Sequence, residues 1–340
     1  MVANPLHFCV LLGYLGVKAS LHSHYARSYL RQTASKMPTN LLTDLRHTTL
    51  ARDIRMTTFL DWFKRMHGEY QAVLFDIDGT MANGQKPLPG NSETIEYLRS
   101  IEFPFFFLTN DGIHTHAQKV KQLERGGVSA TEDEIVSASD ALTSCIVEMG
   151  LVGRKVVVIG EGGGQDEYLS AAGAVPVRVD ELVECSAIFV GEAKFDWFTD
   201  IHKCINHVRQ HPDTRFLISC PDSYWIGQAD GSLGVGAGGI ARFILGILGE
   251  LGITPESRFL GKPNPGIFLA TIERLKSKFG IKDVENKRLI MLGDALFSDI
   301  CGANRLGMTS ALVMTGLTTQ QLLDDAKGDN VPDLVFSRLG

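Results

Sequence analysis

No C-x-x-C pair occurs among the six cysteines of this 340-residue sequence, which argues against a zinc site and against a disulfide framework. Scattered cysteines of this kind suit a reducing compartment. There is no basic excess either: the formal net charge is −6, whereas a nucleic-acid-binding protein is expected to present a basic face. Residues 6–17 are mostly apolar, but about twelve residues are too few to span a bilayer. We therefore expect no nucleic-acid partner and no membrane partner.

The N-terminal residues 1–66 differ in composition from the rest of the chain, and we treat them as an extension. From Lys18 the segment is basic, and no acidic residue precedes Asp44. This composition resembles an organellar transit peptide. The alternative is a gene start placed too far upstream, since Met56 opens an amphipathic lead-in at Phe59. We expect a cytoplasmic protein, or a mitochondrial or other organellar one if residues 1–55 are a transit peptide.

Short apolar strand patterns alternate with helical patterns from residue 67 onward, which is typical of an α/β fold with a doubly wound parallel sheet. The patterns form two sets. Residues 67–152 and 253–340 make a core, and residues 153–252 make an inserted α/β domain. The predicted core strands are 72–75, 103–108, 134–137, 289–292, 311–314 and 334–336, and those of the insertion are 155–159, 187–190 and 215–218. A helix is predicted over 91–100, capped by Asn91 or Ser92, and another over 114–123.

The stretch from Gln71 to Thr80 joins a buried strand to two carboxylates. The apolar run ends at Asp76, and Gly79 breaks regular structure just beyond it. In an extended segment residues i and i+2 point the same way, so Asp76 and Asp78 can face one site. The carboxyl ends of strands are where open α/β sheets bind their ligands.

Three further motifs follow predicted elements of the core: Thr109-Asn110, Lys262 in Gly261-Lys-Pro-Asn-Pro265, and Gly293-Asp294-x-x-x-x-Asp299. Several carboxylates in one crevice repel each other unless a hard cation lies among them, and an all-oxygen site suits Mg²⁺. Thr109 and Asn110 offer neutral donors for phosphate oxygens, and Lys262 offers a positive charge. Together these groups are typical of phosphoryl transfer.

The four motifs, in this order, resemble those of the haloacid dehalogenase superfamily. The insertion between Asn110 and Lys262 resembles the large C2-type cap of its NagD-like class IIA branch, as does Gly316-Leu-Thr near the end of the chain. The resemblance implies that Asp76 is the nucleophile and forms an aspartyl-phosphate. It implies that Asp78 is the general acid and then the base. Thr109 and Asn110 would hold the phosphate, and Lys262 would neutralise the nucleophile.

The resemblance also implies a Mg²⁺ site made by Asp76, Asp294 and the carbonyl of Asp78, with Asp299 as a direct or nearby ligand. Two departures from the branch stand out. Asp111 follows Asn110 where another Asn or a Ser is usual. His114 and His116 come next, at a predicted helix N-terminus, and we expect them to be a solvated pair; the alternative is a metal or substrate role. In the insertion, Cys220-Pro-Asp222 departs from the usual Asn-Pro-Asp, and we expect the loop 220–225 to contact substrate through Asp222. The alternative is a turn that packs only on the core of the insertion.

We conclude that the sequence predicts a Mg²⁺-dependent phosphatase acting on a small phosphorylated metabolite. Carbon–halogen hydrolysis needs neither the metal nor Asp78, so these residues argue against it. A phosphotransferase or mutase of the same fold and a non-catalytic phosphometabolite-binding protein stay open as alternatives. The glycines Gly234, Gly236 and Gly239 match a dinucleotide fingerprint, but no buried strand precedes them, so we expect a loop. The sequence also allows a homo-oligomer formed through the cap.

Overall fold

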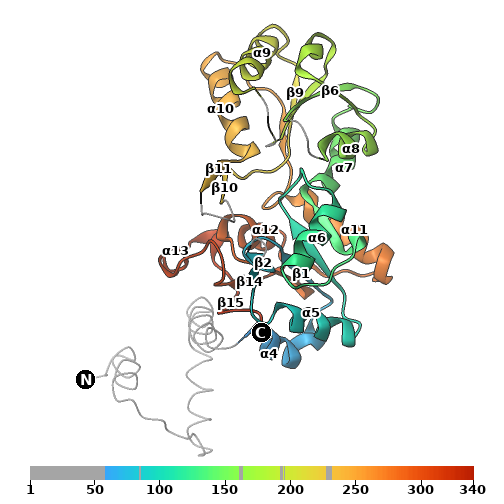
Figure 1. Cartoon of the computed structure of the whole chain (residues 1–340), viewed down its shortest axis with the longest axis vertical. Helices are drawn as coiled ribbons and strands as arrows, with labels where there is room; N and C mark the ends of the chain where they lie inside the picture. Colours follow the sequence, from blue (N-terminus) through green and yellow to red (C-terminus); the bar gives the residue numbers. More distant parts are fainter. Residues whose placement is uncertain (1–57, 84–85, 161–163, 192–193, 195, 227–231) are drawn as a thin grey trace, which may run out of the picture. The chain divides into compact units, whose positions relative to one another are not determined.

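The computed structural model describes residues 58–83, 86–160, 164–191, 194, 196–226 and 232–340, which Figure 1 follows along the chain. The basic N-terminal stretch that resembles a transit peptide lies outside these residues. Within the described ranges, no helix combines the length and the apolar character needed to cross a membrane.

The first sheet has six parallel strands in the order β15-β14-β13-β1-β4-β5. The chain moves outward from β1 through β4 to β5, then returns to the other side of β1 with β13 and continues outward to β15. This reversal confirms the predicted doubly wound fold. The strands are β1 Ala72–Asp76, β4 Phe105–Thr109, β5 Ile135–Ser137, β13 Leu289–Gly293, β14 Thr309–Val313 and β15 Leu334–Phe336.

Helices cover both faces of the first sheet because its strands are apolar on both sides. In β1, Val73 and Phe75 pack into one cluster, and Ala72 and Leu74 pack into another. The helices of the first cluster are α4 Phe59–Met66, α5 Asn91–Ser100 and α6 His116–Arg125, and those of the second are α11 Pro265–Phe279 and α12 Cys301–Arg305.

Helix α4 belongs with this sheet, although the sequence placed residues 59–66 in the N-terminal extension. Phe59 and Phe63 are fully buried, and the Phe59 ring meets the Phe336 ring edge-on at 5.5 Å between centroids. The side chain of Thr58 caps the helix by accepting from the backbone N–H of Asp61. The aromatic lead-in is therefore a structural part of the core.

The second sheet has five parallel strands in the order β12-β9-β8-β6-β7. They are β6 Lys155–Ile159, β7 Val175–Val177, β8 Ala187–Val190, β9 Arg215–Ile218 and β12 Ser257–Phe259. Strand β12 lies beyond residue 252, where the sequence ended the insertion. Parallel pairing with β9 cannot be recognised from so short a segment. The division into a core and an inserted cap stays a proposal.

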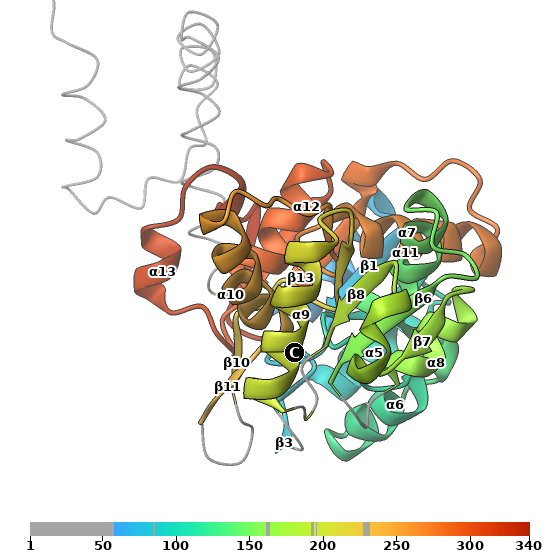
Figure 2. The ribbon, with the colours of Figure 1, turned by 90° about the horizontal axis from the view of Figure 1, so that it is seen from above.

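Two pairs of helices cover the second sheet, as Figure 2 shows. Val157 and Ile159 of β6 pack with α9 and α10, whereas Val156 and Val158 pack with α7 and α8. These helices are α7 Leu142–Glu148, α8 Gln165–Ala171, α9 Trp197–Gln210 and α10 Ala237–Glu250. Other short elements are β2 Ala82–Asn83, β3 Lys86–Pro87 and α13 Gln320–Asp324.

A two-stranded antiparallel sheet, β10 Tyr224–Ile226 with β11 Leu233–Val235, precedes α10. Part of the predicted loop 220–225 is thus a strand. Close packing explains a glycine of the dinucleotide-like pattern: a Cβ on Gly236 would lie 2.4 Å from the carbonyl oxygen of Asp222. A side chain there would collide with backbone, so only glycine fits. β11 is mostly exposed, so the buried strand that the fingerprint needs does not precede this cluster.

Candidate active site

The strand order brings three of the predicted motifs to one edge of the first sheet. β1 ends at Asp76, β4 ends at Thr109, and Asp294 follows the last residue of β13. These three strands are neighbours and run parallel, so their carboxyl ends meet. The chain reverses its direction of travel across the sheet between β1 and β13, which is where open α/β sheets bind ligands.

Lys262 is buried beside two of the predicted carboxylates. Its Nζ lies 2.5 Å from Oδ1 of Asp76 and 2.8 Å from Oδ1 of Asp299, and it donates to the carbonyl of Leu108 at 3.2 Å. The contact with Asp299 is an ion pair that lacks hydrogen-bond alignment. Burial by itself would lower the pKa of Lys262, but Asp299 and Asp76 outweigh it and raise the pKa. The ammonium therefore stays charged.

Asp76, Asp294 and Asp299 are buried, and each offers an oxygen to a cluster in which these oxygens lie within 4.8 Å of one another. Burial, together with Asp299, raises the pKa of Asp294 to about 7. Burial also raises the pKa of Asp76 well above its usual value; Lys262 opposes this shift, and the other two carboxylates add to it. The negative charge of three buried carboxylates exceeds the positive charge of one ammonium, and their all-oxygen donor set suits a hard divalent cation.

The carboxylate of Asp294 is held in place by the Gly316-Leu-Thr motif. Its Oδ2 accepts from the backbone N–H of Leu317 at 2.5 Å, and its carbonyl accepts from the Thr318 hydroxyl at 2.6 Å. A Cβ on Gly316 would lie 1.8 Å from Oδ2 of Asp294, and one on Gly79 would lie 2.4 Å from it. Glycine at both positions makes room for this carboxylate.

The side chain of Asp78 lies apart from the carboxylate cluster. Its Oδ2 accepts from Nζ of Lys119 at 3.1 Å, and its Oδ1 accepts from Nε2 of Gln122 at 2.7 Å. The side chain is 41% exposed, unlike that of Asp76. This placement agrees with two different roles for Asp76 and Asp78. A metal contact through the carbonyl of Asp78 stays a prediction.

The side chain of Asn110 is occupied by protein partners. Its Nδ2 donates to Oδ2 of Asp222 at 3.0 Å and to the carbonyl of Lys262 at 2.9 Å, while its Oδ1 accepts from the backbone N–H of Lys262 at 2.7 Å. Thr109 accepts from the backbone N–H of Asp111 through Oγ1 at 3.1 Å. The structure thus brings Asp222 onto the Thr-Asn motif. In this arrangement the Asn110 amide positions Lys262 and has no donor left for phosphate.

Comparison with known families agrees with this geometry. A family model described as haloacid dehalogenase-like hydrolase matches residues 73–174, which contain Asp76, Asp78, Thr109 and Asn110. A second model, of HAD-hydrolase-like proteins, matches residues 259–340, which contain Lys262 and Asp294. The chain belongs to the haloacid dehalogenase-like hydrolases. The family and enzyme class predicted from the four motifs are confirmed.

Relatives of this haloacid dehalogenase-like hydrolase align over most of its length. The acid sugar phosphatase of Staphylococcus aureus is 29% identical over 264 residues, which is 78% of this chain and 93% of the relative. The structure of p-nitrophenyl phosphatase from Archaeoglobus fulgidus is 26% identical, with a TM-score of 0.64 over 79% of this chain and 97% of that one. NagD from Escherichia coli K-12, at 21% identity and a TM-score of 0.65 over 79% of this chain and 97% of its own, shares the fold.

The departures from the family pattern have structural partners in this hydrolase. The carboxylate of Asp111 accepts from the backbone N–H groups of Ile113 and His114 and pairs with Lys119 at 2.8 Å. The turn at Asp111 includes His114, and Thr115 is the N-cap of α6. The helix therefore begins at His116 and not at His114. The expectation of a solvated histidine pair is wrong for His116, whose Nε2 lies 2.9 Å from Oδ2 of Asp140 at 17% side-chain exposure.

Two residues that support the site of this hydrolase were missed or misassigned from the sequence. Lys119 is almost fully buried, although a lysine on an amphipathic helix normally faces solvent. Asn91 does not cap α5, since Gly90 takes that position; its side chain donates to the carbonyls of Thr80 and Met81 and holds the loop that follows Asp78. The distance of Lys119 and Asn91 from the motifs along the sequence does not predict the burial of the first or the hydrogen bonds of the second.

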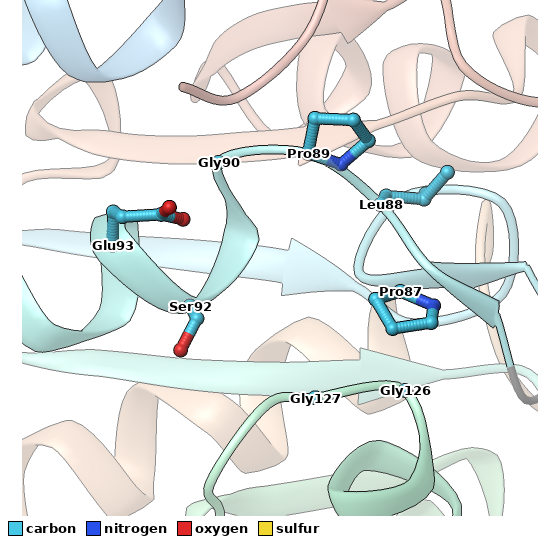
Figure 3. A pocket seen from close by; sticks show the side chains of 8 residues that line it. All are labelled: Pro87, Leu88, Pro89, Gly90, Ser92, Glu93, Gly126 and Gly127. Atoms are coloured by element: carbon cyan, nitrogen blue, oxygen red, sulfur yellow. The ribbon is translucent and has the colours of Figure 1, made fainter.

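A separate hollow of about 310 Å³ lies on the surface of this hydrolase and is drawn in Figure 3. It is lined by residues 87–90, Ser92, Glu93, Gly126 and Gly127. Glu93 is the only ionisable side chain in this lining, and none of the predicted site residues belongs to it. The hollow is not the candidate active site.

Proposed function

We propose that this hydrolase is a Mg²⁺-dependent phosphatase that hydrolyses small phosphomonoesters, such as sugar phosphates or nucleoside monophosphates, through an aspartyl-phosphate. The observation that carries the proposal is the buried 2.5 Å contact of Lys262 with Asp76, inside a cluster of three carboxylates. A carboxylate attacks an anionic phosphate more readily when positive charge lies beside it.

Each proposed step uses a residue of the chain at a stated atom. A carboxylate oxygen of Asp76 bonds to phosphorus, the bond from phosphorus to the ester oxygen breaks, and Asp78 gives its proton to the leaving oxygen. Asp78 then takes a proton from water as the water oxygen bonds to phosphorus and Asp76 leaves as a carboxylate. The products are an alcohol and inorganic phosphate, and both aspartates regain their starting states.

The residues present fit a divalent cation. Asp76, Asp294 and Asp299 would hold Mg²⁺, with the carbonyl of Asp78 as a further oxygen, because their buried negative charge exceeds that of the Lys262 ammonium. When bound, the cation supplies positive charge for the phosphate oxygens. The chain contributes the rest: Lys262 favours the ionised form of Asp76 by opposing the rise in its pKa, and the Thr109 hydroxyl offers a donor to phosphate.

Substrate choice is proposed to reside in the cap, residues 153–252, since the four motifs meet only the phosphoryl group and the metal. The contact of Asp222 with Asn110 supports this assignment because it puts a cap carboxylate beside the Thr-Asn motif. The names of the two phosphatase relatives support a small phosphomonoester as the substrate class.

The test is release of inorganic phosphate from a panel of phosphorylated metabolites by the purified protein, with Mg²⁺ and after chelation. We expect Mg²⁺-dependent release from a subset of the panel and none from the Asp76→Asn variant. Release by Asp76→Asn at more than a few per cent of the wild-type rate would contradict the nucleophile assignment. Transfer of phosphate to a second metabolite in place of water would support a phosphotransferase instead.

A further inference from the structure

The carboxylate of Asp78 accepts hydrogen bonds from two side chains of one helix. Gln122 binds Oδ1 at 2.7 Å and Lys119 binds Oδ2 at 3.1 Å, and both lie on α6. The two side chains are also hydrogen-bonded to each other, since Nζ of Lys119 donates to Oε1 of Gln122 at 2.8 Å. With each oxygen held by a different donor, the carboxylate plane cannot turn freely.

Lys119 is itself fixed from the other side. Its third partner is the carboxylate of Asp111, at 2.8 Å, so the three donors of the ammonium face three acceptors. Asp111 is in turn held by two backbone N–H groups and by the ring of His114 at 2.6 Å. A lysine needed only to anchor α6 would be satisfied by Asp111. Its remaining contacts go to Asp78 and to the residue that binds the other oxygen of Asp78.

We propose that Lys119 and Gln122 are positioning residues that hold the carboxyl group of Asp78 in the orientation needed for proton transfer to the leaving oxygen. The inference rests on the proposed function, in which Asp78 is the acid. Among the contacts of the described residues, the side chains of Lys119 and Gln122 meet Asp78 and do not meet the oxygens of the carboxylate cluster. In the first step, phosphoryl transfer to Asp76, their loss should therefore matter only where the leaving group needs a proton.

Two aryl phosphates of similar shape test this inference. The p-nitrophenolate anion leaves readily without a proton, whereas the phenolate anion of phenyl phosphate is a poorer leaving group. The parameter is kcat/KM, which reports the steps up to phosphoryl transfer. For Gln122→Met, we expect kcat/KM to fall about tenfold or more with phenyl phosphate and less than about threefold with p-nitrophenyl phosphate.

Lys119 is tested by a paired variant, Lys119→Met with Asp111→Asn, because Lys119→Met alone would remove the ammonium that pairs with the Asp111 carboxylate and would destabilise the fold. The same selective loss is expected. Lys121→Met, which removes an exposed charge from the same helix, is the matched control and should behave as wild type with both substrates. In an Asp78→Asn background, Gln122→Met should cause no further loss.

Several results would overturn the inference. Equal losses with the two substrates, a further loss in the Asp78→Asn background, or a Gln122→Met protein that no longer folds would each assign the pair to structural stability. The proposed function fails in a distinguishable way: the wild-type protein would then hydrolyse neither aryl phosphate, or Asp76→Asn would remain active.

Discussion

Replacing Gly316 by alanine adds one methyl group at the most crowded point beside the proposed metal site. The new Cβ would lie 1.8 Å from Oδ2 and 2.5 Å from Cγ of Asp294, where ordinary contact begins at 3.4 Å. The carboxylate would have to retreat by about 1.5 Å to restore that contact. It has little room to do so, because Asp294 is 1% exposed and Gly79 packs against the same oxygen.

The expected cost has two parts. The retreat breaks the 2.5 Å hydrogen bond from the backbone N–H of Leu317, and a hydrogen bond to a charged group contributes about 1.5–3 kcal/mol. Overpacking adds about 1–3 kcal/mol, partly offset by relaxation, so we expect a loss of about 2–4 kcal/mol. At about 2–4 °C per kcal/mol, Tm should fall by roughly 5–15 °C. Activity should fall at least about 100-fold, since a displacement near 1 Å costs that much.

The assays are thermal unfolding with and without Mg²⁺ and kcat/KM for p-nitrophenyl phosphate. Besides the lower Tm, the gain in Tm on adding Mg²⁺ should shrink, because the displaced carboxylate no longer fits the ligand set. Gly246→Ala is the control: nothing lies within 4 Å of its new Cβ, and alanine should stabilise α10 by up to about 1 kcal/mol. A Gly316→Ala protein with wild-type kcat/KM and an unchanged response to Mg²⁺ would refute the placement of Asp294 at the metal.

Three further predictions address the same site. Asp76→Asn should fold normally and lose activity by several orders of magnitude, measured as phosphate release. The pKa of Asp294 is raised to about 7 in the metal-free native state, so that state keeps a proton that the unfolded chain releases at lower pH. The free energy of unfolding without metal should therefore decline from about pH 4 to about pH 7. Mg²⁺ must displace that proton, so its effect on Tm should be larger at about pH 8 than at about pH 5.5. Asp222→Ala should change relative kcat/KM across phosphate substrates by about tenfold or more.

The residues of the first sheet that we propose to carry the chemistry were predictable because their signals are local. A buried strand followed at once by Asp76, and another followed by Asn110, mark carboxyl strand ends whatever the neighbouring strands are. Parallel pairing then brings those ends together without further information. The same logic covers Asp294 after β13. Local pattern and sheet topology thus agree for the predicted site.

The burial of Lys119 and His116 could not be predicted in this way, because each has a carboxylate partner that is distant in the chain: Asp78 lies 41 residues from Lys119, and Asp140 lies 24 residues from His116. The apolar pattern of α6 predicts a helix, but it assigns any lysine on it to solvent. Lys119 is buried only because two carboxylates, Asp78 and Asp111, compensate its charge. The contact between His116 and Asp140 similarly joins segments 24 residues apart. Charge compensation of this kind depends on the tertiary fold, which a single sequence does not contain.

The contact between Asp222 and Asn110 decides how the Asp222→Ala result should be interpreted. Both N–H groups of the Asn110 amide are used, one by Asp222 and one by the carbonyl of Lys262, so a phosphate contact through Nδ2 of Asn110 must replace one of these bonds. Asp222 accepts from Asn110 through Oδ2, so its Oδ1 can meet a substrate without breaking the contact. Exchanging one hydrogen bond for another costs little free energy, so the contact is compatible with substrate binding. If Asp222 recognises the leaving group, its loss will change activity unequally across substrates. If Asp222 serves only to hold Asn110, all substrates will lose activity equally; substrate choice would then lie outside this loop, whose role would be in folding.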